Sequence, residues 1–539
     1  MSNPIEFNKI SDYVNRSYFY YRLFEGHEPL PYDDGKGFLT IGVGFNIDGS
    51  RQKDVLAAVL EEMNVFSLSN SVEKKFREDN ELPVETYQQM KERHFAIVEQ
   101  FQQIILNYPT DIENKSVTES IVREKLNQKL VEITGVEGKV FSLSGSESKS
   151  VYSNLLKGIG WGRDFESGYT HSFKGFAELL RDRLDLNVPD IENTNEFAVL
   201  ISMAFNSGLA GKSVIGDILV NSIRTGDRAR AWYEIRYNSN SYKETKKWTV
   251  GLPDGTAKRR FVEAEYFSLF TSPYNPTRQE TIDLFQMLSE PEPFSTDFNT
   301  LRDKIIAYEA RFGELSGENN RDMVAVANDE YSDHVGTLTQ NLAPAKNKLL
   351  EEFGPQIFDD VSSNDYQFHV LNIQILKDDV SDVVGLHIDS ALNNGDGVLS
   401  DNLVVGNALN NRIEGLSGDD ILWGLDGSDI INGGEGNDVL VGGRDNDTLS
   451  GGVGKNYLYG GEGNDHLYAQ SESSLSDLDA DYLFGEEGDD SLYAAAGMTV
   501  MTGGLGLDTY FIDLGTGTNF ISFDANLSLN SDNKCNTHG

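Results

Sequence analysis

Residues 433–468 read GGEGNDVLVGGRDNDTLSGGVGKNYLYGGEGNDHLY, which is four consecutive units of nine residues with one layout. Each unit opens with two glycines, carries Asp or Asn at its sixth position and has a leucine at its eighth. A fixed period indicates a repeat architecture, in which stacked units bury a continuous core. We therefore expect each unit to be a glycine-rich turn followed by a short strand, and two units to complete one coil of a parallel β-roll.

The same period extends from Gly406 to Phe511, with one insertion, AQSESSL, at residues 469–475. The eighth position is apolar in every unit, and a glycine-rich disordered tail would not preserve such a pattern. The side chains expected to face the inside of the roll are Ile413, Leu422, Ile431, Leu440, Leu449, Leu458, Leu467, Leu483, Leu492, Met501 and Tyr510.

The sixth position supplies the carboxylates Asp420, Asp429, Asp438, Asp447, Asp465, Asp481, Asp490 and Asp508. Carboxylates beside the carbonyl groups of open glycine turns are the hard oxygen ligands that Ca²⁺ prefers. These units resemble the calcium-binding repeats of RTX proteins, GGxGxDxUx, over roughly residues 400–515. The resemblance implies several structural calcium ions, with the eight aspartates as metal ligands. Asn411, Asn456 and Thr499 stand at the same position, where we expect weaker or empty sites.

The charge of the chain is concentrated in this region. The 539 residues have a formal net charge of −41, and residues 391–539 contain 25 acidic and four basic side chains. Such an excess repels nucleic acid and anionic membranes and favours a protein that gathers cations. No apolar stretch approaches the ~18 residues of a membrane span, and the N-terminus lacks the pattern of a cleaved signal peptide. The single cysteine, Cys535, excludes an internal disulfide bond.

A chain of this length should contain two to four domains. We expect an α+β N-terminal domain that is mainly helical with a small β-hairpin lobe, a helical middle region and an all-β parallel roll. The boundaries that we assign are 1–270 for the N-terminal domain, with an insertion at about 46–195, 271–395 for a helical linker or accessory domain, 396–515 for the roll and 516–539 for a C-terminal tail.

A second informative stretch, FEGHEPLPYDDGKGFLTIGVGF, covers residues 24–45. The preceding residues have helical spacing, and Pro29 and Pro31 stop the helix near Glu25. From Tyr32 to Phe45 the pattern predicts a hairpin. A helix end would then hold Glu25 beside a small sheet that carries Asp34 and Thr40, with a cleft between them.

Here the sequence resembles the phage-type lysozymes, the endolysin family of muramidases, whose motif is Glu-x8-Asp-x5-Thr. Glu25, Asp34 and Thr40 match it, whereas Phe45 stands where many members have His. LISMAFNSGLAG at 200–211 is similar to the buried central helix of the family, with Asn206 facing the cleft. GLPDGTAKRRFVEAEYF at 251–267 is similar to a helix near the end of the family's domain. We expect its matching residues to form structural ion pairs, namely Arg259, Arg260 and Glu263.

The resemblance implies hydrolysis of the β-1,4 bond between N-acetylmuramic acid and N-acetylglucosamine. Glu25 would be the general acid, Asp34 would stay ionised and activate water, and Thr40 would hold that water. The family is of the inverting type, which predicts a separation of about 6.5–9.5 Å between the two carboxyl groups. Asn206 would contact the substrate, and catalysis would need no cofactor.

The two resemblances together imply a secreted peptidoglycan hydrolase with antibacterial or wall-lytic action. Its expected partners are peptidoglycan glycan strands, a type I exporter that reads residues 516–539, and an immunity protein in the producing cell. RTX proteins generally leave Gram-negative cells by this route. Two alternatives remain open at this point: a lytic transglycosylase or chitinase on the same fold, and a non-catalytic glycan-binding surface protein.

Overall fold

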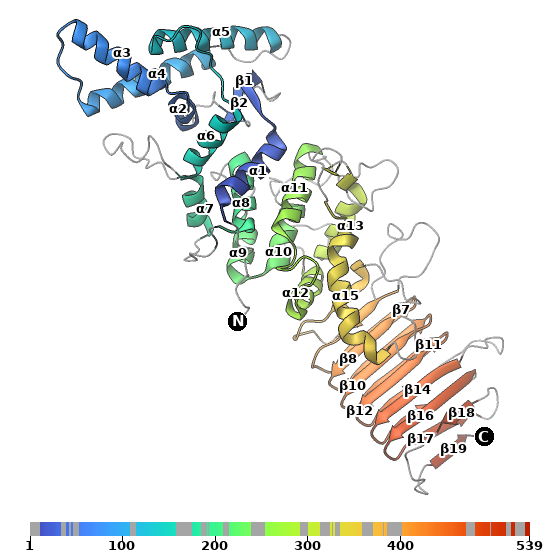
Figure 1. The fold of residues 1–539 in the computed structure, drawn as a ribbon. Coiled ribbons are helices and arrows are strands. Elements are labelled where there is room, and N and C mark those ends of the chain that lie inside the picture. Colours follow the sequence, from blue (N-terminus) through green and yellow to red (C-terminus); the bar gives the residue numbers. More distant parts are fainter. Residues whose placement is uncertain are drawn as a thin grey trace. The chain divides into compact units, whose positions relative to one another are not determined.

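The computed structural model describes most of the chain (Figure 1). The described residues are 11–33, 39–42, 45–46, 53–107, 115–157, 175–184, 191, 193–207, 215–238, 254–291, 300–312, 324–325, 327–328, 335–357, 370–380, 382–384, 401–469, 480–495, 497–513, 519–522 and 534–538. The chain forms two compact units. The N-terminal unit consists of residues 1–227, 231–268 and 329–333, and the C-terminal unit consists of residues 228–230, 269–328 and 334–539.

The N-terminal unit is mainly helical and contains one small sheet. Its described elements are α1 (Tyr13–Glu25), β1 (Glu28–Asp33), β2 (Leu39–Gly42), β3 (Phe45–Asn46), α2 (Lys53–Glu62), α3 (Val65–Asp79), α4 (Tyr87–Leu106), α5 (Lys115–Thr134), α6 (Gly145–Lys157), α7 (Phe176–Leu184), α8 (Asn195–Ser207), α9 (Asp217–Thr225), the second half of α10 (Arg228–Tyr233), the π-helix η1 (Glu234–Asn238) and α11 (Asp254–Phe267).

Helix α1 begins and ends where local chemistry requires it. The Asp12 carboxylate accepts hydrogen bonds from the backbone N–H groups of Val14 at 2.9 Å and Asn15 at 3.1 Å. Two of the free N–H groups at the helix start are thereby satisfied. At the other end, Gly26 takes a φ of 67°, a left-handed conformation that suits glycine. The helix therefore stops at Glu25, as the sequence predicts.

The expected hairpin follows directly. Strands β1, β2 and β3 form an antiparallel sheet in that order, and Tyr32 pairs with Thr40. Gly42 has a φ of +67°, and a Cβ atom there would lie 2.7 Å from the Ser148 hydroxyl oxygen. Phe45, at the position where the related lysozymes often have His, is 1% exposed. An apolar side chain thus fills the core beneath the sheet.

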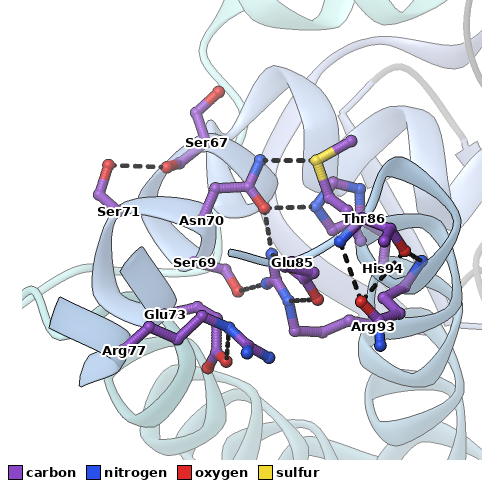
Figure 2. A network of polar contacts seen from close by, with 12 residues as sticks. Ser67, Ser69, Asn70, Ser71, Glu73, Arg77, Glu85, Thr86, Arg93 and His94 are labelled. Carbon is purple, nitrogen blue, oxygen red and sulfur yellow. Dashed lines mark hydrogen bonds and ion pairs between the residues drawn. The ribbon is translucent and has the colours of Figure 1, made fainter. Parts of the chain in front are cut away.

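Helices α3 and α4 are joined by a polar network (Figure 2). The Arg93 guanidinium contacts both Glu85 carboxylate oxygens at 3.2 Å, the Ser69 hydroxyl at 2.5 Å and the Asn70 side-chain oxygen. His94 Nε2 lies 2.8 Å from the same Asn70 oxygen. Burial, reinforced by the Arg93 charge, lowers the pKa of His94 to about 4. The imidazole is therefore neutral near pH 7, and the network fixes the two helices against each other.

The C-terminal unit begins with helices and continues as a two-sheet β-roll. Its helices are α12 (Arg278–Leu288), α13 (Leu301–Phe312), α15 (Leu338–Ile357) and the 3₁₀ turn η2 (Val370–Asn372). Leu301, Ile305 and Tyr308 of α13 are each at most 1% exposed. They form one apolar stripe at spacings of four and three residues, which explains why this segment is helical.

All pairings in the two sheets of the roll are parallel, and every coil contributes one strand to each sheet. The first sheet contains β4 (Ile373–Ile375), β6 (Leu403–Val405), β8 (Ile421–Asp426), β10 (Val439–Arg444), β12 (Tyr457–Glu462), β14 (Ala480–Glu487), β16 (Met498–Leu505) and β18 (Asn519–Ser522). The second contains β5 (Asp382–Val384), β7 (Arg412–Ser417), β9 (Ile430–Glu435), β11 (Thr448–Val453), β13 (His466–Tyr468), β15 (Ser491–Tyr493), β17 (Thr509–Asp513) and β19 (Lys534–His538). The sheets thus extend beyond residues 396–515, the range predicted for the roll, because β4 and β5 precede it and β18 and β19 follow it.

The core of the roll is a single column of inward side chains. All eleven residues expected at the eighth position are buried, from Ile413 at 0% to Tyr510 at 3% exposed, and they pack in one cluster with Leu376, Val404 and Ala469. Glycine at the second position allows the tight corner. Gly434, for example, has a φ of +110°, and a Cβ atom there would collide with the Leu416 carbonyl oxygen one coil earlier.

The insertion at 469–475 does not disturb the register. The hydrogen bond from the Asp447 N–H to Asp465 Oδ1 spans 18 residues, and the equivalent bond from the Asp465 N–H to Asp490 Oδ1 spans 25. Their lengths are 2.7 and 2.8 Å. Strand β12 still pairs in register with β14, Leu458 opposite Leu483.

The expected fold class is confirmed: a helical N-terminal region with a small β-hairpin sheet, a helical middle region and a C-terminal parallel β-roll. Among the helices that the structure describes, none combines the length and the apolar character that a bilayer crossing requires.

Candidate calcium sites and predicted catalytic residues

The sixth-position aspartates form two rows along the edges of the roll. One carboxylate oxygen of each is used within the protein: Asp438 Oδ1 accepts the backbone N–H of Asp420 at 2.9 Å, and Asp447 Oδ1 accepts that of Asp429 at 2.7 Å. Each aspartate thus binds the backbone one coil earlier. None is more than 4% exposed, the set being Asp420, Asp429, Asp438, Asp447, Asp465, Asp481, Asp490 and Asp508.

The second oxygen of most of these carboxylates has no hydrogen-bond partner among the residues that the structure describes. This holds for the buried Oδ2 atoms of Asp420, Asp429, Asp438, Asp447, Asp465 and Asp490. Asp438 Oδ2 points to the open side of Gly433, where the carbonyl oxygen of Gly451 also lies. A Cβ atom at Gly433 would collide with both oxygens. Glycine therefore leaves room for a group that the oxygens of two successive coils can bind together.

The electrostatic environment of these carboxylates favours the binding of a cation. Burial raises the pKa of Asp438 from its usual 3.8 to about 8 and that of Asp447 also to about 8. Burial likewise raises the pKa of Asp420, Asp429, Asp481 and Asp490 to about 7. Asp465 rises to about 6 for the same reason. Such a carboxylate ionises at neutral pH only at a cost, which a bound cation offsets.

The donor set fits calcium. In the part of the chain that the structure describes, no three His, Cys, Asp or Glu side chains converge on one point. A site built from one carboxylate and several turn carbonyls lacks the nitrogen and sulfur ligands that transition metals favour. Ca²⁺ takes six to eight oxygen ligands in flexible geometry, so carboxylate and carbonyl oxygens from neighbouring coils are suitable.

The family model of the RTX calcium-binding nonapeptide repeat (4 copies) matches residues 405–440, 432–467 and 477–510. These are RTX calcium-binding repeats. The RTX roll accordingly binds structural calcium, as expected from its aspartates. RTX repeats are typical of extracellular proteins exported by type I secretion. A search of curated proteins gave no match to the chain.

The RTX positions without aspartate differ chemically. Asn456 accepts the Asp438 N–H through Oδ1 at 3.0 Å, while its Nδ2 donates to the Gly454 carbonyl oxygen at 3.3 Å. The amide thus donates to a turn carbonyl where a carboxylate oxygen would be a metal ligand. Thr499 is 0% exposed and offers only a hydroxyl group. Weaker or empty sites at these positions remain a prediction.

The sequence patterns did not predict a second row of side-chain hydrogen bonds, which is formed by residues at the fifth position of the units. At the fifth position, Asp419 Oδ1 accepts the Asn437 N–H at 2.7 Å, and Asn464 Oδ1 accepts the Asp489 N–H at 2.8 Å. In these bonds the backbone N–H of the later coil donates to a side chain of the earlier coil. At the sixth position the N–H of the earlier coil donates to a side chain of the later one. The frequency of Asp and Asn at the fifth position was the available signal. Both rows together fix each turn against its two neighbours.

The structure describes the predicted catalytic residues only in part. Glu25 is the last residue of α1 and Asn206 lies in α8, but their side chains are outside the described set. Asp34 is outside the described residues, and so is its distance from Glu25. Thr40 lies in β2 and is 3% exposed, and its hydroxyl donates to the Tyr32 carbonyl oxygen at 3.4 Å. The hydroxyl oxygen retains its acceptor capacity for water.

A buried ion-pair cluster connects the segments that carry these residues. Arg259 Nε lies 3.1 Å from a Glu263 carboxylate oxygen, and Arg260 contacts the other oxygen. The Arg259 guanidinium lies 4.4 Å from the ring centroid of Phe24, the residue before Glu25. Its Nη2 also donates to the Ser202 carbonyl oxygen in α8 at 3.4 Å. The expected ion pairs therefore exist, but they lie in the core, with the three residues at most 5% exposed.

Proposed function

We propose that this protein is a secreted, calcium-dependent peptidoglycan hydrolase that cleaves the β-1,4 bond between N-acetylmuramic acid and N-acetylglucosamine. The observation that carries the proposal is the order of elements around the Glu-x8-Asp-x5-Thr pattern. A helix ends at Glu25, and a three-stranded antiparallel sheet follows at once with Thr40 in its central strand. A general acid at a helix end beside a sheet that positions water is a workable arrangement for glycoside hydrolysis.

The buried cluster around Glu263 supports this proposal. It binds the end of α1, the middle of α8 and helix α11 to one another through Phe24, Ser202 and Arg259. Residues that must act on one substrate need such rigid support, because small displacements of catalytic groups lower the rate strongly. The cluster therefore connects the end of α1, which carries Glu25, to α8, which carries Asn206.

In the proposed mechanism, Glu25 protonates the oxygen of the leaving sugar. Asp34 stays ionised, activates a water molecule and stabilises the positive charge that develops on the sugar ring. Thr40 orients this water through the lone pairs of its hydroxyl oxygen, since its proton is directed to the Tyr32 carbonyl. Inversion of configuration follows when the water attacks from the face opposite to the leaving group.

The RTX roll supports export and action outside the cell. Peptidoglycan lies outside the cytoplasm, and RTX repeats are typical of type I secretion substrates. We propose that residues 516–539 contain the export signal, that the antibacterial targets are neighbouring cells, and that an immunity protein protects the producer. The acidic roll would be neutralised by calcium before the enzyme meets an anionic wall.

The deciding experiment is mass spectrometry of purified peptidoglycan after digestion by the calcium-loaded protein. Products with reducing muramic acid ends support the muramidase, anhydro ends support a lytic transglycosylase, and the absence of products supports a non-catalytic glycan-binding protein. Glu25→Gln should lower activity by about 10²–10⁴-fold, the usual contribution of general acid catalysis.

The matched control is Glu28→Gln, which makes the same chemical change three residues later at an exposed position of β1. We expect this variant to retain wild-type activity. Near-wild-type cleavage by Glu25→Gln would contradict the assignment of Glu25 as the acid.

A further inference from the structure

The first two sixth-position residues of the roll, Asn402 and Asn411, are both amides, whereas in later coils Asn456 and Thr499 stand singly among aspartates. Asn411 is 2% exposed and uses both of its side-chain polar atoms within the protein. Its Oδ1 accepts the Asn407 N–H at 2.9 Å, and its Nδ2 donates to Asn407 Oδ1 at 2.9 Å. In the next coil, one carboxylate oxygen of Asp429 accepts the Asn411 N–H, and the other has no hydrogen-bond partner within the described part of the chain. Protein groups therefore satisfy both side-chain polar atoms of Asn411 but only one side-chain oxygen of Asp429 in the described structure.

Further amide groups reinforce the same end. Asn402 donates through Nδ2 to Asp420 Oδ1 at 2.9 Å, one coil later. Asn407 donates through its own Nδ2 to the Val380 carbonyl oxygen at 2.7 Å and to that of Lys377. Asn372 donates to the Asp401 carbonyl oxygen at 3.0 Å. These uncharged side chains fix the turns without adding buried negative charge, and hence without the need for a cation.

Helices of the same unit contact the strand at this end of the roll. Arg302 of α13 donates to the Ile373 carbonyl oxygen at 2.7 Å, and Gln286 of α12 donates to that of Leu376 at 2.9 Å. Lys377 forms an ion pair with Glu290 at 2.9 Å. The terminal strand of a solenoid has open backbone groups, and a capping element is needed to satisfy them. Here β4 has such partners, and Leu376 belongs to the core column of the roll.

We propose that helices α12 and α13, strands β4 and β6 and the turn at Asn407–Asn411 form a calcium-independent folding nucleus, on which the coils from Asp420 onward assemble only when calcium binds. The boundary lies where the sixth-position residue changes from amide to carboxylate. Before it, side-chain hydrogen bonds and helices hold the coil. After it, each coil adds a buried carboxylate that must be neutralised. The inference rests on the RTX calcium sites and is independent of the proposed enzymatic activity.

Hydrogen exchange measured by mass spectrometry on the full-length protein tests the proposal. In the presence of a calcium chelator, the amides of β4 and β6 should stay protected, whereas those of β10, β11, β12 and β13 should exchange as in an unfolded chain. With calcium, both groups should be protected. Exchange of β4 and β6 as fast as that of β11 in the chelator would overturn the proposal, and so would full protection of β11 there.

A pair of variants sharpens the test. Asn411→Asp installs a buried carboxylate in the nucleus, so protection of β6 should become calcium-dependent, and calcium titration should show one additional ion. The control Asn410→Asp makes the same charge change one residue earlier, where Oδ1 accepts only the Ser428 N–H at 3.1 Å and a carboxylate can do the same. It should behave as the wild type. Wild-type stoichiometry and wild-type protection in Asn411→Asp would contradict the inference.

Discussion

Buried carboxylates occur in both units, but their partners differ. Glu263 in the N-terminal unit is 1% exposed and lies between two guanidinium groups, those of Arg259 and Arg260. Asp438 in the roll is 0% exposed, and in the described part of the chain its Oδ2 atom has no hydrogen-bond partner. The first charge is neutralised by the polypeptide itself, whereas the second depends on an ion from the solvent. The difference predicts that the N-terminal unit folds without calcium, whereas the coils of the roll from Asp420 onward require it.

Removal of calcium should produce the largest effect. A ligand that binds only the folded state at 100 times its Kd contributes about 2.7 kcal/mol per site, and the roll has several sites. We expect a chelator to abolish the β-type signal of the coils from Asp420 onward while the helical signal of the N-terminal unit persists. Far-UV circular dichroism and thermal unfolding of the full-length protein measure this. A single unfolding transition whose midpoint does not change with calcium concentration would contradict the distinction between the two units.

An acid-to-amide exchange separates the two kinds of carboxylate. Glu263→Gln leaves two buried guanidinium groups without their carboxylate, and breaking a buried pair in this way costs about 3–5 kcal/mol. Urea unfolding of the N-terminal unit in calcium should show the loss.

The counterpart is Asp438→Asn, which removes a buried carboxylate whose Oδ2 atom has no hydrogen-bond partner in the described ranges. It should leave the calcium-free state no less stable and raise the calcium concentration required for folding. Equal destabilisation of both units by the two variants would argue against the comparison.

The pH dependence is the smallest effect and concerns the roll. Because burial raises the pKa of Asp438 and Asp447 to about 8, the calcium-free roll binds protons more tightly than the unfolded chain does. Its proton-linked stability is therefore present at acidic pH and is lost as the pH rises through about 8. Calcium competes with these protons, so the calcium midpoint should rise by up to about tenfold per unit of falling pH for each proton displaced.

Circular dichroism titrations with calcium at about pH 8 and about pH 6 provide the measurement. In the chelator, the β-type signal should increase towards acidic pH, which is opposite in direction to the effect seen with limiting calcium. An equal midpoint at both pH values would show that the carboxylates ionise without a penalty.

The roll was predictable because its period forces a single solution. The apolar residue at the eighth position of each nine-residue unit can be buried only if each unit adds one strand. Ile413, Leu440 and Tyr510 indeed belong to one buried cluster. Strands β4 and β5 were not predicted, since residues 373–384 lack the repeat and join the sheets through tertiary contacts. The burial of Glu263 was not predicted either. Arg and Glu at i and i+4 look alike on a surface and in a core, and here Phe24 and Ser202 decide the environment.

The hairpin after α1 illustrates what short motifs can and cannot show. Proline and glycine indicated a hairpin after the helix, since local sequence determines a turn, but β1 begins at Glu28, before the predicted range of Tyr32–Phe45, and the predicted second strand is described as β2 and β3. The roles of Glu25, Asp34, Thr40 and Asn206 stay predictions, because catalysis depends on distances between side chains that no local pattern fixes.

The insertion between β13 and β14 has a consequence for how this protein can change. Coils are spaced by hydrogen bonds between turns, such as that from Asp465 to Asp490, and not by the length of chain that joins them. We therefore expect that the segment between Tyr468 and Ala480 can change in length or sequence without a shift in the register of β14 and β15. For evolution this is a tolerant position at which new sequence can be tried at little risk to the fold, and for an engineer it is a grafting point for a peptide epitope or a binding loop.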